Sequence, residues 1–176
     1  MCLGGWEPQE KAYRGITVEN ERLLDNTGWQ ILRELQGNAR LTFNELGRRV
    51  NLSAPAAAER VRRMEEAGII IGYRAEVDPQ KVGFSLGAFL TVEAPGTNHR
   101  RIASLARELP EVLECHHVTG SESFLMKVVL SGTDHLQELL YKLARWGSPR
   151  TSIVLSSPVL RRGVQRIQGS SVNDDG

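Results

Sequence analysis

The first regular pattern of hydrophobic and polar residues begins near residue 23. Apolar side chains then recur at helical spacing, at Trp29, Ile31, Leu32 and Leu35. Asn26 or Thr27 is a favourable N-cap, and the sequence QGNA contains the glycine and asparagine that commonly end a helix. We therefore predict a helix that starts at Asn26 or Thr27 and ends within that sequence.

A second helix is predicted by the sequence TFNELGRRV. Its first residue, Thr42, forms the T-x-x-E capping box with Glu45, which places the helix start at Thr42. The apolar stripe of this helix consists of Phe43, Leu46 and Val50. Gly47 lowers the helix propensity but permits close approach of a neighbouring helix.

A third helix follows a turn at residues 51–52. Ser53 is a favourable N-cap, and Pro55 is tolerated in the first turn because the backbone N–H groups there have no partner within the helix. We expect this helix to run to about Ala67, with Gly68 as its stop.

Residues 69–77 read IIIGYRAEV and are rich in β-branched and aromatic side chains. They predict a strand, with Gly72 as a wing turn. Three helices with a tight turn before the third, followed by a ribbon, are the pattern of a winged helix-turn-helix domain.

The pattern changes class after a hinge at residues 78–84. The next predicted elements are a strand at 85–94, a helix at 98–110, strands at 111–120 and 121–130, a helix at 132–147 capped by Thr133, and a strand at 150–160. The order βαββαβ is that of the ferredoxin-like unit, an antiparallel sheet with both helices on one face. The uncovered face favours a second copy of the chain as its partner.

These elements predict an α+β protein, an N-terminal winged helix-turn-helix followed by a C-terminal ferredoxin-like βαββαβ sandwich. The expected parts are an extension at 1–22, a winged helix domain at 23–77, the hinge at 78–84, a ferredoxin-like domain at 85–168 and a mobile tail at 169–176.

The composition is that of an ordinary globular protein, with 40% hydrophobic and 24% charged residues and a net charge of +1. No run approaches the about 18 apolar residues of a membrane span. The N-terminus lacks the basic start and apolar block of a secretory signal. The two cysteines, Cys2 and Cys115, give no disulfide framework, so we expect a cytoplasmic protein.

The third predicted helix carries the most informative side chains. Its inward stripe consists of Ala57, Val61 and Met64. An outward stripe with the same spacing consists of Ala56, Arg60 and Arg63. Arg62 lies within helical reach of Glu59 and Glu66 and is expected to pair with them.

Small side chains at the start of this helix would let its backbone approach the floor of a DNA groove. Alanine methyls can pack there on thymine methyls, and arginine can bind guanine or phosphate. The residues expected to contact DNA are Thr42, Ser53, Ala54, Pro55, Ala56, Arg60 and Arg63. A merely solvated, charged helix face is the plainer interpretation, but the capped helix and tight turn before it favour DNA.

Cys115, His116 and His117 are residue types that bind metals. On a strand Cys115 and His117 share one face and His116 lies on the other, so two neighbouring ligands lack a second pair. We expect packed structural residues, no metal and no cofactor. The sequence also lacks the nucleophile-elbow, P-loop, zinc-protease and dinucleotide motifs, so we expect no enzyme.

Three stretches resemble a known family. They read LDNTGWQILRELQGNARLTFNELGRRVNLS, ERVRRMEEAGIIIGY and ECHHVTGSESFLMKV. They are similar to the first DNA-binding helices, the recognition helix and two effector-domain strands of the Lrp/AsnC transcription regulators. The resemblance, from about Leu23 to Gln168, implies a dimer that binds double-stranded DNA and assembles further, to a tetramer or octamer. It also implies amino acids or similar small molecules as effectors.

The family's ligand loop corresponds here to the sequence VTGSES. Its residues are Val118, Thr119, Gly120, Ser121, Glu122 and Ser123. Thr133 and Asp134, at the next strand-to-helix junction, either add side-chain contacts to the effector or cap the helix. The family often has G-D-x-D at this turn, whereas here Glu122 is the single acid and alternates away from both serines. We therefore expect weak amino-acid binding, a different ligand or none.

Two functions follow from these patterns. The first is a DNA-binding transcriptional regulator that oligomerises through its C-terminal domain and responds to an amino acid or related small molecule. The second is a small-molecule-binding ferredoxin-like sensor whose N-terminal helices mediate protein contacts. Salt-dependent binding to duplex DNA separates the two.

Overall fold

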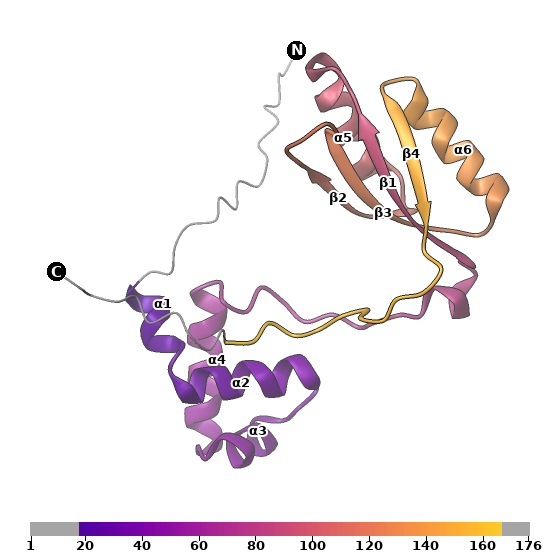
Figure 1. Ribbon diagram of the computed structural model, residues 1–176. Helices are drawn as coiled ribbons and strands as arrows, with labels where there is room; N and C mark the ends of the chain where they lie inside the picture. The colour runs from indigo at the N-terminus through magenta and orange to yellow at the C-terminus, as the bar shows by residue number, and fades with distance from the viewer. Residues whose placement is uncertain (1–17, 167–176) are drawn as a thin grey trace. The chain divides into compact units, whose positions relative to one another are not determined.

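The computed structural model describes residues 18–166 and divides them into two compact units (Figure 1). A helical unit comprises residues 18–75 and 159–166, and a sheet unit comprises residues 76–158. The expected tail at 169–176 and most of the extension at 1–22 lie outside the described residues. No helix within 18–166 has the length and apolar character needed to cross a membrane.

The helical unit contains four helices. They are α1 (Val18–Leu23), α2 (Asn26–Gly37), α3 (Phe43–Val50) and α4 (Ala54–Glu66). The sequence pattern did not predict α1, which has no apolar period of its own. Leu23, at its end, is buried in the core of the unit. A Cβ atom on Gly28 would lie 1.9 Å from the Leu23 carbonyl oxygen, so glycine lets α2 approach the end of α1.

The helix ends show how side chains fix the element boundaries. Asp25, not Asn26 or Thr27, is the N-cap of α2, because its Oδ1 accepts the Gly28 N–H at 2.7 Å. The predicted caps Thr42 and Ser53 are confirmed for α3 and α4.

The core of the helical unit is formed by one side of each helix. Its buried members beyond Leu23 are Ile31, Leu46, Val50, Ala57, Val61 and Met64. The predicted inward stripe of α4 is therefore confirmed. The prediction that Phe43 belongs to the apolar stripe of α3 is wrong, since Phe43 is 47% exposed. It is the first residue of α3 and extends past the core, over a shallow hollow that it shares with Pro55 and Ala58.

The strand predicted at residues 69–77 is absent. Residues 71–78 have no regular secondary structure. Gly72 has φ of 147°, outside the β region, and no described strand supplies a hydrogen-bond ladder for this segment. β-branched residues favour extended backbone, but they cannot form a strand without a partner.

The hinge predicted at 78–84 contains a short 3₁₀ turn, η1 (Pro79–Val82), which Asp78 caps and Gly83 ends with φ of 96°. The sheet unit that follows consists of β1 (Leu86–Glu93), η2 (Gly96–Asn98), α5 (His99–Glu108), β2 (Val112–His117), β3 (Phe124–Leu130), α6 (Thr133–Ala144) and β4 (Ser148–Ile153). Their order is the predicted βαββαβ, with shorter elements. The N-cap of α6 is Gly132, so the predicted cap Thr133 is instead the first helical residue.

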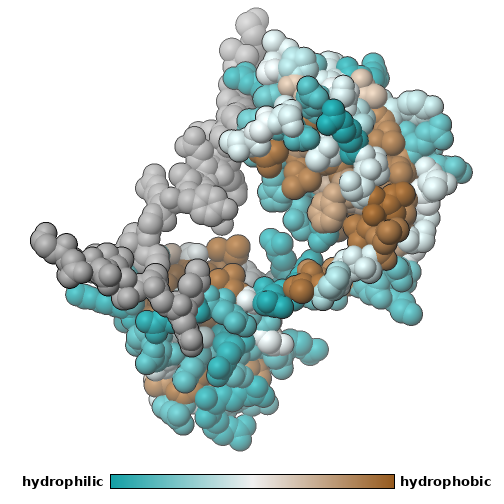
Figure 2. Space-filling model, viewed as in Figure 1, coloured by the Kyte–Doolittle hydropathy of each residue, from teal (hydrophilic) through white to brown (hydrophobic). Residues whose placement is uncertain are grey.

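The four strands form one antiparallel sheet in the order β2-β3-β1-β4. Both helices pack on the same face, because Ile102 of α5 and Leu139 of α6 share one core with the inward residues of the central strands. Those strand residues are Ala88, Leu90, Val92, Phe124, Met126, Val128 and Leu130. Alternate residues lie on the open face, where Figure 2 shows hydrophobic residues among hydrophilic ones over the strands.

Candidate DNA-binding and effector sites

Helices α3 and α4 form a helix-turn-helix whose tight turn rests on two backbone features. Asn51 ends α3 in the left-handed region, with φ of 56°. Gly47 faces the turn, and a Cβ atom there would lie 2.6 Å from the Leu52 carbonyl oxygen. The sequence predicted a close approach at Gly47, and the structure assigns that approach to the backbone of the turn.

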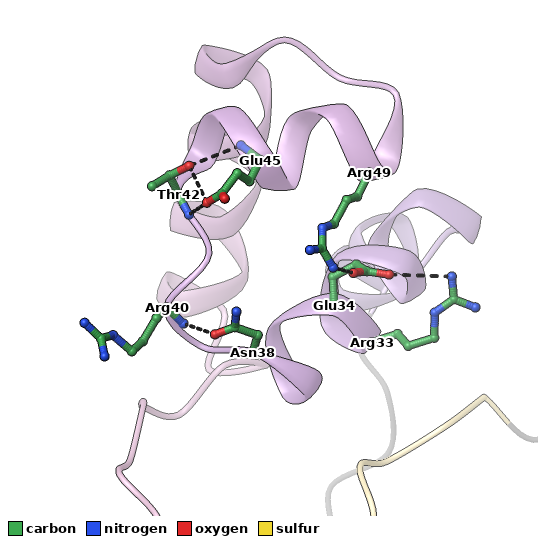
Figure 3. Close-up of polar contacts among 7 residues, drawn as sticks. All are labelled: Arg33, Glu34, Asn38, Arg40, Thr42, Glu45 and Arg49. Atoms are coloured by element: carbon green, nitrogen blue, oxygen red, sulfur yellow. Dashed lines mark hydrogen bonds and ion pairs between the residues drawn. The ribbon is translucent and has the colours of Figure 1, made fainter.

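Thr42 and Glu45 hold the start of α3 (Figure 3). The Thr42 hydroxyl accepts the Glu45 N–H at 3.2 Å and donates to Glu45 Oε2 at 2.8 Å. The Thr42 N–H, donating to the same oxygen at 3.0 Å, and the hydroxyl together lower the pKa of Glu45. Thr42, a predicted DNA contact, therefore uses its hydroxyl hydrogen within the cap.

The start of α4 presents small side chains to solvent, as predicted. Ser53, Pro55 and Ala56 are exposed, and Ala54 is half-buried. Ser53 Oγ accepts the Ala56 N–H at 3.3 Å, which leaves the hydroxyl hydrogen free to donate to a phosphate oxygen.

The three arginines of α4 lie in different environments. Arg60 is half-buried and forms an ion pair with Asp25 at 2.5 Å. Arg62 pairs with Glu59 and Glu66, as expected from the helical spacing, and its hydrogen bonds to Glu59 raise its pKa.

Arg63 is exposed, and its side chain makes no hydrogen bond or ion pair within residues 18–166. Of the two arginines predicted to contact DNA, Arg60 is held by the protein and Arg63 is available.

Two further arginines of the helical unit were missed by the sequence reasoning. Arg40 and Arg48 are exposed, and neither side chain forms an ion pair within the part of the chain that the structure describes. Arg49, by contrast, pairs with Glu34 at 2.8 Å, and Arg33 approaches the same carboxylate (Figure 3). Sequence spacing gives no signal that separates Arg48 from Arg49, because the partner of Arg49, Glu34, lies on another helix.

The predicted effector loop connects β2 and β3. The Val118 N–H donates to the Ser123 carbonyl at 3.0 Å and closes the turn. Ser123 Oγ donates to the Ala94 carbonyl at 3.1 Å, so this hydroxyl binds the end of β1. Gly120 has φ of 117°, and a Cβ atom there would meet nothing within 4 Å, so space is open beside it.

The acid of the loop, Glu122, lies beside an arginine that the sequence reasoning missed. Arg150 of β4 approaches Glu122 at 3.6 Å and Glu93 at 3.6 Å. A hydrogen bond from Ser121 at 2.7 Å is the first cause of the lowered pKa of Glu122, and Arg150 adds to it. Only the strand register, in which Arg150 pairs with Thr91, brings this cation to the loop.

Thr133 and Asp134 do not join the effector loop within the chain. The loop ends where β3 begins, at Phe124, and these two residues follow the other end of β3 at Leu130. Seven residues of strand at about 3.3 Å each separate the two places by about 20 Å. Contacts from both places to one small molecule within one chain are therefore excluded.

The Cys115–His117 segment is built into the sheet. Cys115 packs against the core, and burial raises the pKa of its thiol. The His117 ring contacts the rings of His99 and Phe124, while His116 lies beside Glu114 at 3.5 Å. Among residues 18–166 no group of three or more metal-binding side chains comes together.

A winged helix-turn-helix followed by a ferredoxin-like domain defines a class of DNA-binding regulators. Residues 24–71 match the family model for winged helix-turn-helix DNA-binding, and residues 87–164 match the Lrp/AsnC ligand binding domain. The chain belongs to the Lrp/AsnC family of transcriptional regulators.

Several known proteins are similar over most of their length. An uncharacterised regulator of Bacillus subtilis, YezC, is 41% identical over 134 residues, which cover 76% of this chain and 95% of the relative. The regulatory protein AsnC of Escherichia coli is 34% identical over 144 residues, 79% of this chain and 95% of AsnC.

Solved structures agree with these relatives. The LrpC structure from B. subtilis has a TM-score of 0.75 at 28% identity and covers 78% of this chain and 99% of LrpC. A regulator from Neisseria meningitidis, solved in complex with L-Met, has a TM-score of 0.75 at 31% identity and covers 80% and 96% of the two chains.

Proposed function

We propose that the helical unit reads duplex DNA with the start of α4 and with Arg63, and that the chain acts in the cytoplasm as a regulator and not as an enzyme. The observation that carries this proposal is the capped helix-turn-helix whose second helix begins with exposed Ser53, Pro55 and Ala56. Small side chains there permit groove entry, and Arg63 lies two turns further along the helix.

A matched pair of arginine variants tests this assignment. Arg63→Ala removes an arginine whose side chain makes no hydrogen bond or ion pair among residues 18–166, whereas Arg62→Ala removes one that Glu59 and Glu66 already hold. If Arg63 forms a bidentate base contact, its loss costs about 1–3 kcal/mol of binding free energy. Fluorescence anisotropy with a genomic target should show the larger loss for Arg63→Ala, at one salt concentration.

The salt dependence of binding separates the two functions considered for this chain. A DNA-binding regulator loses affinity for duplex DNA steeply as salt rises, because phosphate contacts release counterions. A sensor whose helices contact another protein would show no measurable binding to a duplex at any salt concentration.

We further propose that a small molecule of the amino-acid class binds beside the loop at residues 118–123. Gly120 leaves open space there, and backbone N–H groups of a tight turn can hold a carboxylate. Glu122 is the loop's acceptor for an ammonium group, but Arg150 lies beside it and competes. We therefore expect weak binding.

Glu122→Gln tests the effector proposal because it removes the charge and keeps the size of the side chain. Glu93→Gln is the matched control, since Glu93 faces the same arginine from β1. Calorimetry with the twenty amino acids should detect binding to the parent and to Glu93→Gln, and weaker binding to Glu122→Gln. Equal binding to all three proteins would place the pocket elsewhere.

A further inference from the structure

The chain returns to its helical unit after the last strand. Residues 159–166 follow the sheet unit in sequence, but they group with α1–α4, and Figure 1 shows the yellow end of the ribbon reaching these helices. The sequence reasoning placed this stretch in the C-terminal domain. Within residues 18–166 the chain therefore passes between the two units twice, at residues 75–76 and at residues 158–159.

The side chain of Gln36 holds this segment through its main chain. Gln36 Nε2 donates to the Val164 carbonyl at 3.0 Å, and the Val164 N–H donates to Gln36 Oε1 at 2.6 Å. The Gln36 amide presents an N–H donor and a carbonyl acceptor side by side, so it pairs with the N–H and C=O of one residue, as a residue of an antiparallel neighbouring strand would. The contact does not depend on the identity of the residue at 164.

A second contact extends the docking along α2. Arg166 Nη1 donates to Asn26 Oδ1 at 2.9 Å. Gln36 is near the end of α2 and Asn26 is its first residue. The segment therefore runs along the helix from its C-terminal end towards its N-terminal end, with the long arginine side chain spanning the remaining distance.

An open apolar groove of about 420 Å³ lies beside the docked segment in the helical unit. Leu32 and Leu35 of α2 form one wall, and the irregular segment from Ile69 to Arg74 contributes the other. Val164 lines the groove from the docked segment. A Cβ atom at Gly163 would lie 3.2 Å from Gln36 Cβ, so glycine is the residue that fits most easily where the segment meets the helix.

We propose that α2, at the edge of this groove, is the docking site for the chain's own C-terminal segment, residues 159–166, and that Gln36 is the residue that binds it. Because the docked segment continues from the sheet unit in sequence, it is a second covalent connection between the two units, in addition to the hinge. The same-chain segment is the occupant because it already makes both main-chain hydrogen bonds and the Arg166 contact.

A disulfide test checks both the docking and its same-chain origin. Gln36→Cys together with Gly163→Cys, in a chain carrying Cys2→Ser and Cys115→Ala, places two Cβ atoms about 3.2 Å apart, close to the roughly 3.5–4.5 Å of a disulfide. Gln30→Cys with Gly163→Cys is the matched control on the same helix.

Mild oxidation should crosslink the first pair within one chain and leave the control pair reduced, as judged by non-reducing gels and by mass spectrometry of linked peptides. A dimer-sized band would show that the segment docks on another subunit and would overturn the same-chain assignment. Equal crosslinking of both pairs, or none in either, would overturn the docking itself.

Hydrogen exchange tests the role of Gln36 in the unmodified main chain. Gln36→Ala removes the acceptor of the Val164 N–H, and exchange at this amide should accelerate by about 2–12-fold, the factor that corresponds to one hydrogen bond. Gln30→Ala makes the same replacement at an exposed glutamine of α2 whose side chain forms no hydrogen bond within residues 18–166, and should leave the rate unchanged. Equal rates in the two variants would remove Gln36 from the proposal.

Discussion

At the scale of single residues, Arg60 shows why a position on an outward stripe does not define a contact. The sequence placed Arg60 with Arg63 on one face of α4. In the structure its guanidinium binds the carboxylate of Asp25, the residue that also caps α2. Arg60 therefore links the recognition helix to the helix that supports it, and we interpret it as a positioning residue.

The first prediction concerns the replacement Arg60→Ala. It removes the ion pair with Asp25 and the packing of the half-buried arginine stem, so the protein should lose about 1 kcal/mol of stability. Arg33→Ala is the control, because Arg33 is 72% exposed and 3.9 Å from its partner, Glu34.

Denaturant unfolding and DNA anisotropy, measured on the same samples, separate the effect of Arg60→Ala on stability from its effect on DNA affinity. We expect a lower unfolding midpoint for Arg60→Ala than for the control, and a smaller loss of DNA affinity than for Arg63→Ala. An unchanged midpoint with a large loss of affinity would make Arg60 a direct DNA contact.

The second prediction concerns the pH dependence of the Asp25 contacts. Burial alone would raise the pKa of Asp25, but the Gly28 N–H and the Arg60 guanidinium outweigh it and lower the pKa below 3.8. A depressed pKa means that the ionised carboxylate stabilises the fold above pH 3.8, the ordinary value, and that this contribution disappears as the pH falls through the lowered pKa.

Asp25→Asn keeps a capping side chain and removes the charge. At pH 7 the variant should be less stable than the parent by up to about 1 kcal/mol, because the pair is partly exposed. In thermal unfolding scans the difference should begin to shrink as the pH falls below 3.8 and vanish below the lowered pKa of Asp25. A difference that persists undiminished at pH 3 would assign the effect to the shape of the cap and not to its charge.

Residue-scale features were predictable where they depend on neighbours in sequence. In the Thr42–Glu45 capping box and in the pairs of Arg62 with Glu59 and Glu66, the two partners are at most four residues apart in the sequence. Both predictions are confirmed. The Asp25–Arg60 and Glu122–Arg150 pairs join residues on different elements. No local spacing encodes them, because the tertiary fold brings the partners together.

At the scale of secondary structure elements, periodicity predicted α2 to α6 and the order of helices and strands along the sheet unit, and failed where an element needs a partner. Helix α4 forms its hydrogen bonds internally, so its apolar spacing and caps were sufficient to predict it. A strand at residues 69–77 would need a neighbouring strand, which no local pattern can supply.

The third prediction compares two glycines in helices of the same unit. Gly47→Ala would place a Cβ atom 2.6 Å from the Leu52 carbonyl oxygen, whereas a Cβ atom at Gly37 meets nothing within 4 Å. Overpacking costs about 1–3 kcal/mol and alanine regains about 1 kcal/mol of helix propensity. We expect Gly47→Ala to lose up to about 2 kcal/mol of stability and Gly37→Ala to lose none.

Thermal and denaturant unfolding of the two variants measure this difference. Gly47→Ala should also weaken DNA binding, because the turn sets how α4 is held against α3. If Gly47→Ala is as stable as Gly37→Ala, the close approach at the turn does not constrain the helix-turn-helix.

At the scale of the whole molecule, one face of the sheet has no covering layer among the described residues of the sheet unit, 76–158. The helices cover only the face that carries Leu90 and Met126. On the open face Phe89 is 41% exposed, and Lys127 and Ser152 lie opposite it on the neighbouring strands. The sequence predicted this one-sided arrangement from the order of the elements. The return of residues 159–166 to the helices has no periodic signal and was not predictable.

The last prediction is that a second copy of the chain covers this face, as the sequence pattern indicated. A stable interface buries about 800 Å² on each partner, with apolar residues at its centre and polar ones at its rim. Phe89 occupies a central strand with polar neighbours around it, which fits such an interface. Phe89→Glu would place a charge at the centre, where desolvating it without a partner is costly.

Light scattering on the full chain should give at least twice the 19.6 kDa of one chain for the parent, and a shift towards that single mass for Phe89→Glu. Tyr141→Glu is the control, because Tyr141 is 66% exposed on α6, on the other side of the sheet. Phe89→Leu should restore the larger mass, and circular dichroism checks that each variant is folded. A folded Phe89→Glu protein with the mass of the parent would show that the subunits associate through another surface, and that the open face of the sheet is left to solvent or to a different partner.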